Sequence, residues 1–310
     1  MEHSKTRQIL FVTIGILCAL PWVGTAAALV AGILFSFLLG NPWPQQSARL
    51  SKIILQLSVV GLGFGLGLGD VLRTGRDSLL YTIVGISLTL LLGLALGKLL
   101  GNDRNTSALI AFGTAICGGS AIAAMAPVLK AKNEETAVAL ATIFTLNSVA
   151  LLLFPVIGHL LNLGQDLFGT WAGLAIHDTS SVVGAAAAYG EKALSVGTTV
   201  KLTRTIWIAP VAFATALLLK SDQKAKIPLF ILGFILAATI RTLLPEYANV
   251  WNVLTATARQ FLVVTLFLIG AGLSREVLQK VGLRPLIQGV TLWLAVSAAT
   301  LGALVSIGVA

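Results

Sequence analysis

The sequence has 310 residues, of which 56% are hydrophobic and 11% are charged. A soluble domain carries about 25% charged residues, so a composition this poor in charge excludes an ordinary water-soluble protein. The formal net charge of +9 does not indicate nucleic-acid binding, because Lys and Arg lie in short loops between apolar runs, which is the positive-inside pattern of membrane proteins.

Apolar segments follow one another along the whole chain, with no soluble domain between them. We find eleven, at about 9–22, 24–39, 53–69, 79–101, 106–129, 135–161, 168–189, 194–219, 227–244, 254–273 and 286–308. Their lengths are typical of helices, and they lack the alternating pattern of a β-barrel. The first segment continues into another apolar run without a clear cleavage site, so we interpret it as a retained helix.

The two cysteines, Cys18 and Cys117, lie far apart in apolar segments, which predicts free thiols and no disulfide framework. The sequence as a whole predicts an all-α polytopic membrane protein with about 9 to 11 transmembrane segments.

Two internal repeats are visible in the sequence. Residues 56–60 resemble residues 260–264, and residues 115–120 resemble residues 175–180 with an offset of 60. Such repeats are typical of transporters with inverted topology.

These repeats lead us to predict a single transmembrane domain over 1–310. We expect a first repeat region at 24–161 and a second at 168–308, with the order of their elements permuted.

The segments 106–129 and 168–189 are short enough to be re-entrant hairpins. Each arm of about 11 residues would reach roughly 16 Å, close to the bilayer centre, at 1.5 Å per residue. If the N-terminus is cytoplasmic, two hairpins and nine spans place fourteen Lys and Arg residues on the cytoplasmic side of the membrane and five on the other side. If both segments cross the membrane fully, these numbers become twelve and seven. The positive-inside rule therefore favours hairpins, and fully crossing interrupted helices remain the alternative.

The midpoints of these two segments are polar and rich in glycine, and they are predicted to meet at the bilayer midplane. Non-helical backbone at that depth is tolerated only where it is buried in protein or lines a wet cavity. The N–H groups of a returning half-helix suit an anion. The candidate substrate-binding residues at the two tips are Cys117, Gly118, Gly119, Ser120, Thr179, Ser180 and Ser181. The alternative is that the hydroxyl groups only cap the half-helices.

Two basic residues, Lys201 and Arg204, lie within the next predicted span. An ionisable residue at that depth is functional by default, and a spacing of three sets both on one helix face. Asn147 occupies the matching depth in the span after the first hairpin. We expect Arg204, Lys201 and Asn147 to contact a substrate anion; the alternative is that Arg204 neutralises Asp178.

His177 and Asp178 form an adjacent pair of titratable residues inside a predicted span. Asp178 is a candidate for coupling to protons or sodium, and His177 could titrate near neutral pH. The alternative for His177 is a hydrogen-bonded structural role.

One motif in the sequence favours the hypothesis that the protein is an enzyme. Residues 67–70 match the Gly-x-Gly-Asp motif of intramembrane aspartyl proteases, but the partner Tyr-Asp motif is missing and Asp70 falls at a span end. The sequence also lacks a zinc-protease motif and an ATP-binding motif. We therefore expect no enzyme activity, no cofactor and no bound metal.

Residues 112–124 (Phe-Gly-Thr-Ala-Ile-Cys-Gly-Gly-Ser-Ala-Ile-Ala-Ala) and 175–185 (Ala-Ile-His-Asp-Thr-Ser-Ser-Val-Val-Gly-Ala) resemble signature stretches of the YeiH-type family of proposed sulfate exporters. The resemblance runs through roughly residues 10–308. It implies a bacterial inner-membrane protein related to cation:proton antiporters and bile-acid transporters, with paired interrupted helices. It adds no list of functional residues.

The resulting hypothesis is a secondary transporter of a small anion, such as sulfate or an organosulfur anion, coupled to protons or sodium. A cation:proton antiporter with Asp178 as the ion carrier is the alternative. A channel is a third possibility, and an intramembrane protease is a remote one. We expect a multi-pass protein of the bacterial inner membrane, in contact with lipid, and a homodimer by analogy with relatives.

Overall fold

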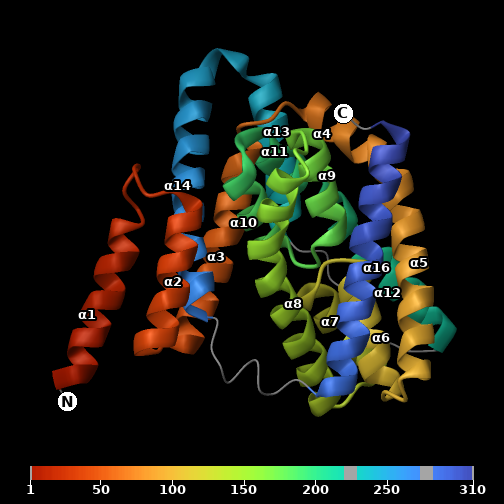
Figure 1. Ribbon diagram of the computed structural model, residues 1–310. Coiled ribbons are helices and arrows are strands. Elements are labelled where there is room, and N and C mark those ends of the chain that lie inside the picture. Colours follow the sequence, from red (N-terminus) through yellow and green to blue (C-terminus); the bar gives the residue numbers. More distant parts are fainter. Residues whose placement is uncertain (1, 220–228, 273–281, 309–310) are drawn as a thin grey trace. The chain divides into compact units, whose positions relative to one another are not determined.

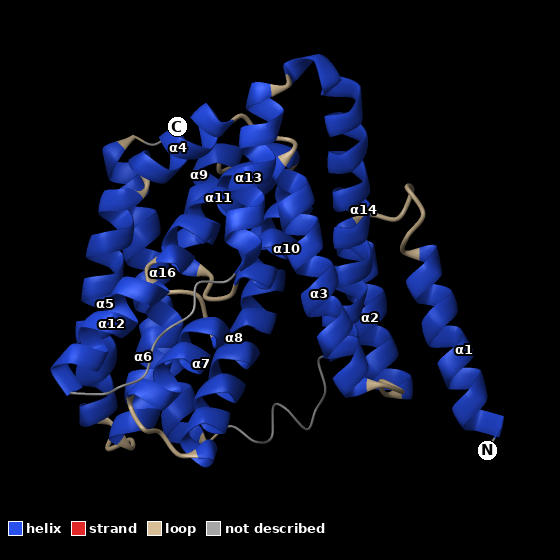
Figure 2. Ribbon diagram, turned by 180° about the vertical axis from the view of Figure 1, so that it is seen from behind, coloured by secondary structure: helices blue, strands red, loops and turns tan. Residues whose placement is uncertain are grey.

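The computed structural model describes residues 2–219, 229–272 and 282–308. Every regular element in these ranges is a helix (Figure 2). The α-helices are α1 Glu2–Leu17, α2 Thr25–Leu39, α3 Pro44–Gly63, α4 Leu68–Asp77, α5 Leu79–Leu99, α6 Arg104–Ala115, α7 Gly119–Val128, α8 Asn133–Leu160, α9 Gln165–Ala175, α10 Thr179–Tyr189, α11 Glu191–Ile206, α12 Ile208–Leu219, α13 Leu229–Leu243, α14 Ala248–Gly272 and α16 Leu283–Ile307. The all-α prediction is confirmed.

Several of these helices are long and apolar enough to cross a membrane. Within the described ranges there are five such stretches: Leu79–Leu99, Asn133–Leu160, Glu191–Leu219, Pro245–Gly272 and Leu283–Ile307. A sixth arises if α3 and α4, which meet at a bend of 108°, count as one broken span. An all-α polytopic membrane protein is therefore confirmed, while the arrangement of nine spans stays a prediction.

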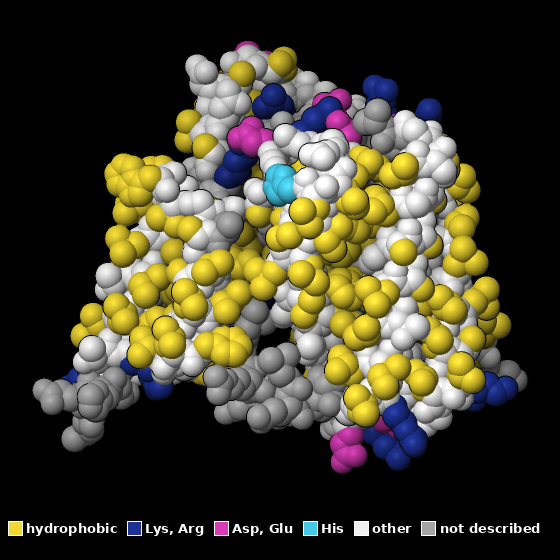
Figure 3. Space-filling model, viewed as in Figure 1, with side chains coloured by type: hydrophobic (Ala, Val, Ile, Leu, Met, Phe, Trp, Pro, Cys, Tyr) yellow, Lys and Arg dark blue, Asp and Glu magenta, His cyan; other side chains and the backbone are white. Residues whose placement is uncertain are grey.

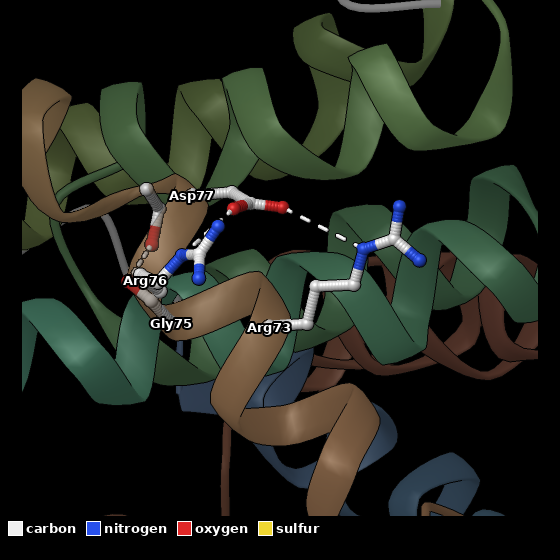
Figure 4. Close-up of polar contacts among 5 residues, drawn as sticks. Arg73, Gly75, Arg76 and Asp77 are labelled. Carbon is white, nitrogen blue, oxygen red and sulfur yellow. Dashed lines mark hydrogen bonds and ion pairs between the residues drawn. The ribbon is translucent and has the colours of Figure 1, made fainter.

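Helix α4 is short, and its polar residues gather toward its C-terminal half. Arg73 and Arg76 both lie near the Asp77 carboxylate, at 3.9 and 3.8 Å (Figure 4). All three side chains are exposed, so these contacts add little stability. This helix was not predicted from the sequence, because its apolar residues cover only one side of a short helix and are too few to form a membrane-crossing run.

The chain divides into two compact units, each built from two separate stretches of sequence. Unit 1 comprises residues 1–71 and 229–277, and unit 2 comprises 72–228 and 278–310. The predicted single domain and its repeat regions stay predictions.

Unit 1 contains the first internal repeat, in which residues 56–60 resemble residues 260–264 at an offset of 204. Helices α2 and α13 have the same length, and α13 and α14 begin 204 residues after α2 and α3. Helix α2 packs on α14, and α3 packs on α13, as a two-fold relation between the pairs requires. Small residues allow this close approach, since a Cβ on Gly63 would lie 2.5 Å from the carbonyl oxygen of Phe234.

Unit 2 contains a helical hairpin formed by α6 and α7. The side chain of Asn105, at the start of α6, donates to Glu135 at the start of α8 at 3.0 Å. Only Leu129–Lys132 separate the end of α7 from α8, and Glu135 also accepts from the Lys132 N–H. The end of α7 therefore lies at the level where α6 began, so α6 and α7 fold back on each other as a hairpin; that this hairpin is re-entrant in the membrane stays a prediction.

The pair α9 and α10 forms a second hairpin, at the opposite end of α8. The hydroxyl of Tyr189, at the end of α10, donates to the carbonyl oxygen of Leu163, just before α9 begins. The Gln165 side chain in turn accepts from the Lys192 N–H. Figure 1 shows α6 and α7 beside the lower part of α8, and α9 and α10 beside its upper part. The two hairpins thus enter unit 2 from opposite sides.

The core of unit 2 lies around these hairpins. Ile110, Ile116, Ile122 and Ile143 are fully buried and belong to one apolar cluster from α6, α7 and α8. On the face drawn in Figure 3, the outward side chains of α8 and α16 are mainly hydrophobic, and charged side chains gather beyond the helix ends. An apolar outer surface around a partly polar interior is what a lipid solvent requires.

Candidate functional site

The two hairpins place two breaks in the helical backbone near the middle of unit 2. Helix α6 ends at Ala115 and α7 begins at Gly119, and Gly118 between them has a φ of +65°. Glycine adopts this left-handed conformation without strain. Helix α9 ends at Ala175 and α10 begins at Thr179. The sequence prediction of breaks at these midpoints agrees with the structure.

The tips of the two hairpins touch. A Cβ on Gly118 would lie 3.2 Å from the Cβ of Asp178, so glycine permits the contact. The backbone N–H of Asp178 donates to the side-chain oxygen of Asn147 at 3.3 Å. Asn147 lies on α8 and is buried. The structure therefore brings together residues of both tips and of the span between them.

Arg204 donates hydrogen bonds to the C-terminal ends of α6 and α9, which are the first helices of the two hairpins. Its Nε donates to the carbonyl oxygen of Ala115 at 2.5 Å and its Nη2 to that of Thr114 at 3.3 Å, both at the end of α6. Its Nη1 donates to the carbonyl oxygen of Leu174, at the end of α9. The last carbonyl groups of a helix lack partners and carry partial negative charge, so a cation there satisfies both needs.

Lys201, one turn earlier on α11, also donates a hydrogen bond to a backbone carbonyl group at a hairpin tip. Its side chain is 0% exposed, and its Nζ donates to the carbonyl oxygen of Ile176 at 2.6 Å, directly after α9. Among the ion pairs found in the described ranges, none joins Lys201 or Arg204 to a carboxylate. The two buried cations are therefore bound to backbone carbonyl groups rather than to Asp178.

Asp178 caps the start of α10. A single carboxylate oxygen, Oδ2, accepts from the Ser181 N–H at 3.2 Å, from the Ser181 hydroxyl at 3.3 Å and from the Ser180 hydroxyl. This side-chain cap satisfies one of the free N–H groups at the start of the helix. Asp178 and Ser180 are half-buried, so the capped end is partly accessible.

We call the place where the tips of the two hairpins meet the crossing. Several buried polar atoms at this crossing have no hydrogen-bond partner within the described ranges. They are both ring nitrogens of His177, the side-chain nitrogen of Asn147 and the hydroxyl of Thr114. His177 is 1% exposed and Asn147 is 3% exposed. Leaving one such group unpaired costs about 1–3 kcal/mol, so a ligand that hydrogen-bonds to these groups would recover that cost.

The other predicted residues surround the same point. Cys117 and Thr179 are buried, Gly119 is half-buried and Ser120 is exposed. Asp70, by contrast, lies in the first turn of α4 and belongs to unit 1.

The backbone partners of Lys201 and Arg204 were not predicted from the sequence. Each hairpin has one helix C-terminus as well as one N-terminus, and the C-terminal carbonyls of Ala115, Leu174 and Ile176 need donors. The signal was available, because two basic residues three positions apart follow the second hairpin. Phe144 was also missed; its ring would lie 3.0 Å from a Cβ on Gly119.

Comparisons with known proteins identify relatives over nearly the whole chain. A family model described as Conserved hypothetical protein 698 matches residues 9–289. A UPF0324 membrane protein of Geobacter sulfurreducens is 66% identical over 98% of both chains. Another, of Bdellovibrio bacteriovorus, is 51% identical over 98% of this chain and 96% of the relative.

A further UPF0324 membrane protein, of Bacteroides thetaiotaomicron, is 52% identical over 90% of this chain and 86% of the relative. No solved structure matches the chain. These relatives are described as bacterial membrane proteins without a stated substrate, so an inference about function depends on the site itself.

Proposed function

This chain belongs to the UPF0324 family of membrane proteins, and we propose that it is a secondary transporter of a small anion in the bacterial inner membrane. The observation that carries the proposal is an excess of positive charge where the two hairpins meet. Lys201 and Arg204 are the buried charged side chains among the described residues, and Asp178 is the carboxylate at the same crossing.

The helix ends do not remove this excess. Two C-termini and two N-termini meet at the crossing, and their partial charges of about −0.5 and +0.5 cancel. If Lys201 and Arg204 are both protonated, one positive charge remains at the crossing after the Asp178 carboxylate is counted. An uncompensated charge away from water costs several kcal/mol, so a bound anion would stabilise the site.

Secondary transport fits the architecture of unit 2. Inverted hairpins whose broken helices meet near the midplane are the arrangement in which transporters bind substrates and coupling ions. We propose that Asp178, with His177 beside it, couples anion movement to protons or sodium. Sulfate or an organosulfur anion follows from the family resemblance and remains a hypothesis about the substrate.

A cation:proton antiporter is the second candidate, and one observation favours it. All hydrogen bonds to the Asp178 carboxylate reach Oδ2, which leaves Oδ1 without a partner among the described residues. A half-buried carboxylate oxygen of this kind could bind a cation. The charge excess argues against it, because a cation would add a further positive charge to the crossing.

Purified protein in liposomes tests the proposal. We expect saturable counterflow of labelled sulfate or of one competing anion from a panel of sulfite, thiosulfate, sulfonates and carboxylates. Flux that does not saturate would indicate a channel. Sodium- or potassium-driven proton movement without anion flux would overturn the proposal in favour of the cation antiporter.

One substitution separates the two candidates further. Asn147→Asp keeps the oxygen that accepts from Asp178 but adds a negative charge at the crossing. Anion flux should be lost, whereas a cation antiporter should retain its activity. The matched control is Asn162→Asp, the same change at an exposed position after α8. Retained anion flux in Asn147→Asp would contradict the anion site.

A further inference from the structure

We infer that the start of α7 binds one oxyanion group of a small organic monoanion, in the position that the Asp178 carboxylate occupies at the start of α10. The inference rests on the proposed anion transport and specifies its substrate class and contacts. It follows from a difference between the two hairpins, which are otherwise related by the offset of 60 residues.

The two hairpin tips differ in their caps. The offset pairs Gly118 with Asp178 and Ser120 with Ser180. At α10, the Asp178 carboxylate accepts from the Ser180 hydroxyl and from the Ser181 N–H. At α7 the capping residue is Gly118, which has no side chain to accept a hydrogen bond, and the Ala121 N–H, the equivalent of Ser181 N–H, bonds to the neutral Cys117 thiol instead of to a carboxylate.

The start of α7 therefore offers donors to a ligand. The first backbone hydrogen bond within α7 runs from Ile122 N to Gly118 O, and in the described part of the chain the N–H groups of Gly119 and Ser120 have no partner. Ser120 is exposed and Gly119 is half-buried, so both can be reached. An oxyanion would receive these N–H groups and the Ser120 hydroxyl, as Asp178 receives its own donors.

Asn147 gives independent evidence for a ligand at this point. Its side-chain oxygen accepts from Asp178 N, which fixes the amide between the two tips, since Asp178 contacts Gly118. Among the residues that the structure describes, the amide nitrogen has no hydrogen-bond partner, although Asn147 is only 3% exposed. A buried donor held in one orientation at the contact between the two tips, next to the free N–H groups of Gly119 and Ser120, is a candidate contact for an anion.

Charge and shape select the class of anion. With Lys201 and Arg204 both protonated, one positive charge is left at the crossing after the Asp178 carboxylate is counted; a monoanion balances it, whereas a dianion such as sulfate leaves an excess negative charge. The Phe144 ring lies beside Gly119 and is 44% exposed. An apolar group attached to the oxyanion can pack on this ring, which favours a carboxylate or sulfonate with a short organic part over an inorganic ion.

Equilibrium binding to the purified full-length protein tests this inference separately from transport. Calorimetric titration with propionate and with methanesulfonate should give saturable binding, at least tenfold tighter than with sulfate. Ser120→Ala should weaken binding about tenfold to a hundredfold, because it removes a hydrogen bond to a charged group. Ser120→Asp should abolish it, because an internal carboxylate then occupies the helix start.

Ser306→Asp, at an exposed position near the end of α16, is the control and should bind as the unaltered protein does. Melting temperatures of all variants separate lost binding from lost folding. Unchanged affinity in a folded Ser120→Asp variant would overturn the binding position, and sulfate binding as tight as propionate would overturn the class. If inorganic anions are transported and neither probe binds, the inference fails while the proposed function stands; if no anion is transported, the proposed function fails too.

Discussion

Arg204 donates from Nε to the carbonyl oxygen of Ala115 at 2.5 Å, so a side chain of α11 completes the hydrogen bonding at the end of α6. The same guanidinium reaches Leu174 at the end of α9. One residue therefore connects the two hairpins, and its planar group with several donors suits this better than a lysine would. This contact makes Arg204 a determinant of the architecture as well as of the charge at the crossing.

We expect Arg204→Met to destabilise the protein strongly. The substitution leaves the carbonyl oxygens of Thr114, Ala115 and Leu174 without the hydrogen bonds that Arg204 donates to them. Each costs about 1–3 kcal/mol, which is large against ordinary stability. Thermal melting of the detergent-solubilised protein measures the loss.

Arg104→Met is the control for this experiment, because Arg104 is exposed at the start of α6 and should tolerate the change. Arg204→Lys keeps the charge but can reach fewer carbonyls, so it should melt between the unaltered protein and Arg204→Met. A melting temperature unchanged in Arg204→Met would show that these hydrogen bonds do not hold the hairpins together.

The re-entrant hairpins predict which loops share a side of the membrane. Arg104→Cys and Lys130→Cys flank the first hairpin and should react with a membrane-impermeant maleimide from one side. Lys192→Cys, after the second hairpin, should react from the other side. Cys18 and Cys117 are buried, and they are replaced by Ala in the background variant. Labelling of Lys130→Cys from the same side as Lys192→Cys would instead show a fully crossing helix.

Helix contact within unit 1 depends on Gly63. A Cβ there would lie 2.5 Å from Phe234 O and 2.9 Å from the Ala237 Cβ, so Gly63→Ala must push α3 and α13 apart. Overpacking of this kind costs about 1–3 kcal/mol. Gly302→Ala is the matched control, because a Cβ there meets nothing within 4 Å. A lower melting temperature for Gly63→Ala alone is expected; equal values for both variants would contradict the packing.

The sequence predicted the apolar helices well because the lipid solvent demands long apolar runs. The predicted segment 135–161 corresponds to α8 Asn133–Leu160, and 286–308 corresponds to α16 Leu283–Ile307. The breaks were predicted too, since Gly118 and Asp178 interrupt apolar stretches where helices have no reason to end. Helix α4 was missed because its apolar residues cover only one side of a short helix.

The candidate site residues could be named from the sequence, and their assignment to a site stays a prediction; their hydrogen-bond partners could not be named. Arg204 and Lys201 were identified from their depth, yet a sequence shows which side chains carry charge and does not show which backbone carbonyls lie near them. Their partners follow only once the hairpins fold back and expose helix C-terminal ends to α11. Asn147 was assigned by its depth, and its contact with Asp178 depends on how the second tip packs on α8.

Asp178→Asn should uncouple anion movement from the ion gradient. A carboxylate can take up a proton or sodium and release it, whereas an amide cannot, and asparagine still accepts from the Ser181 N–H as a helix cap. We therefore expect counterflow to persist in this variant while accumulation driven by a proton or sodium gradient is lost. Asp103→Asn is the matched control, because Asp103 caps α6 in the same way outside the crossing. Gradient-driven accumulation that survives in Asp178→Asn would exclude this carboxylate as the coupling group, and His177→Gln would then test the neighbouring imidazole.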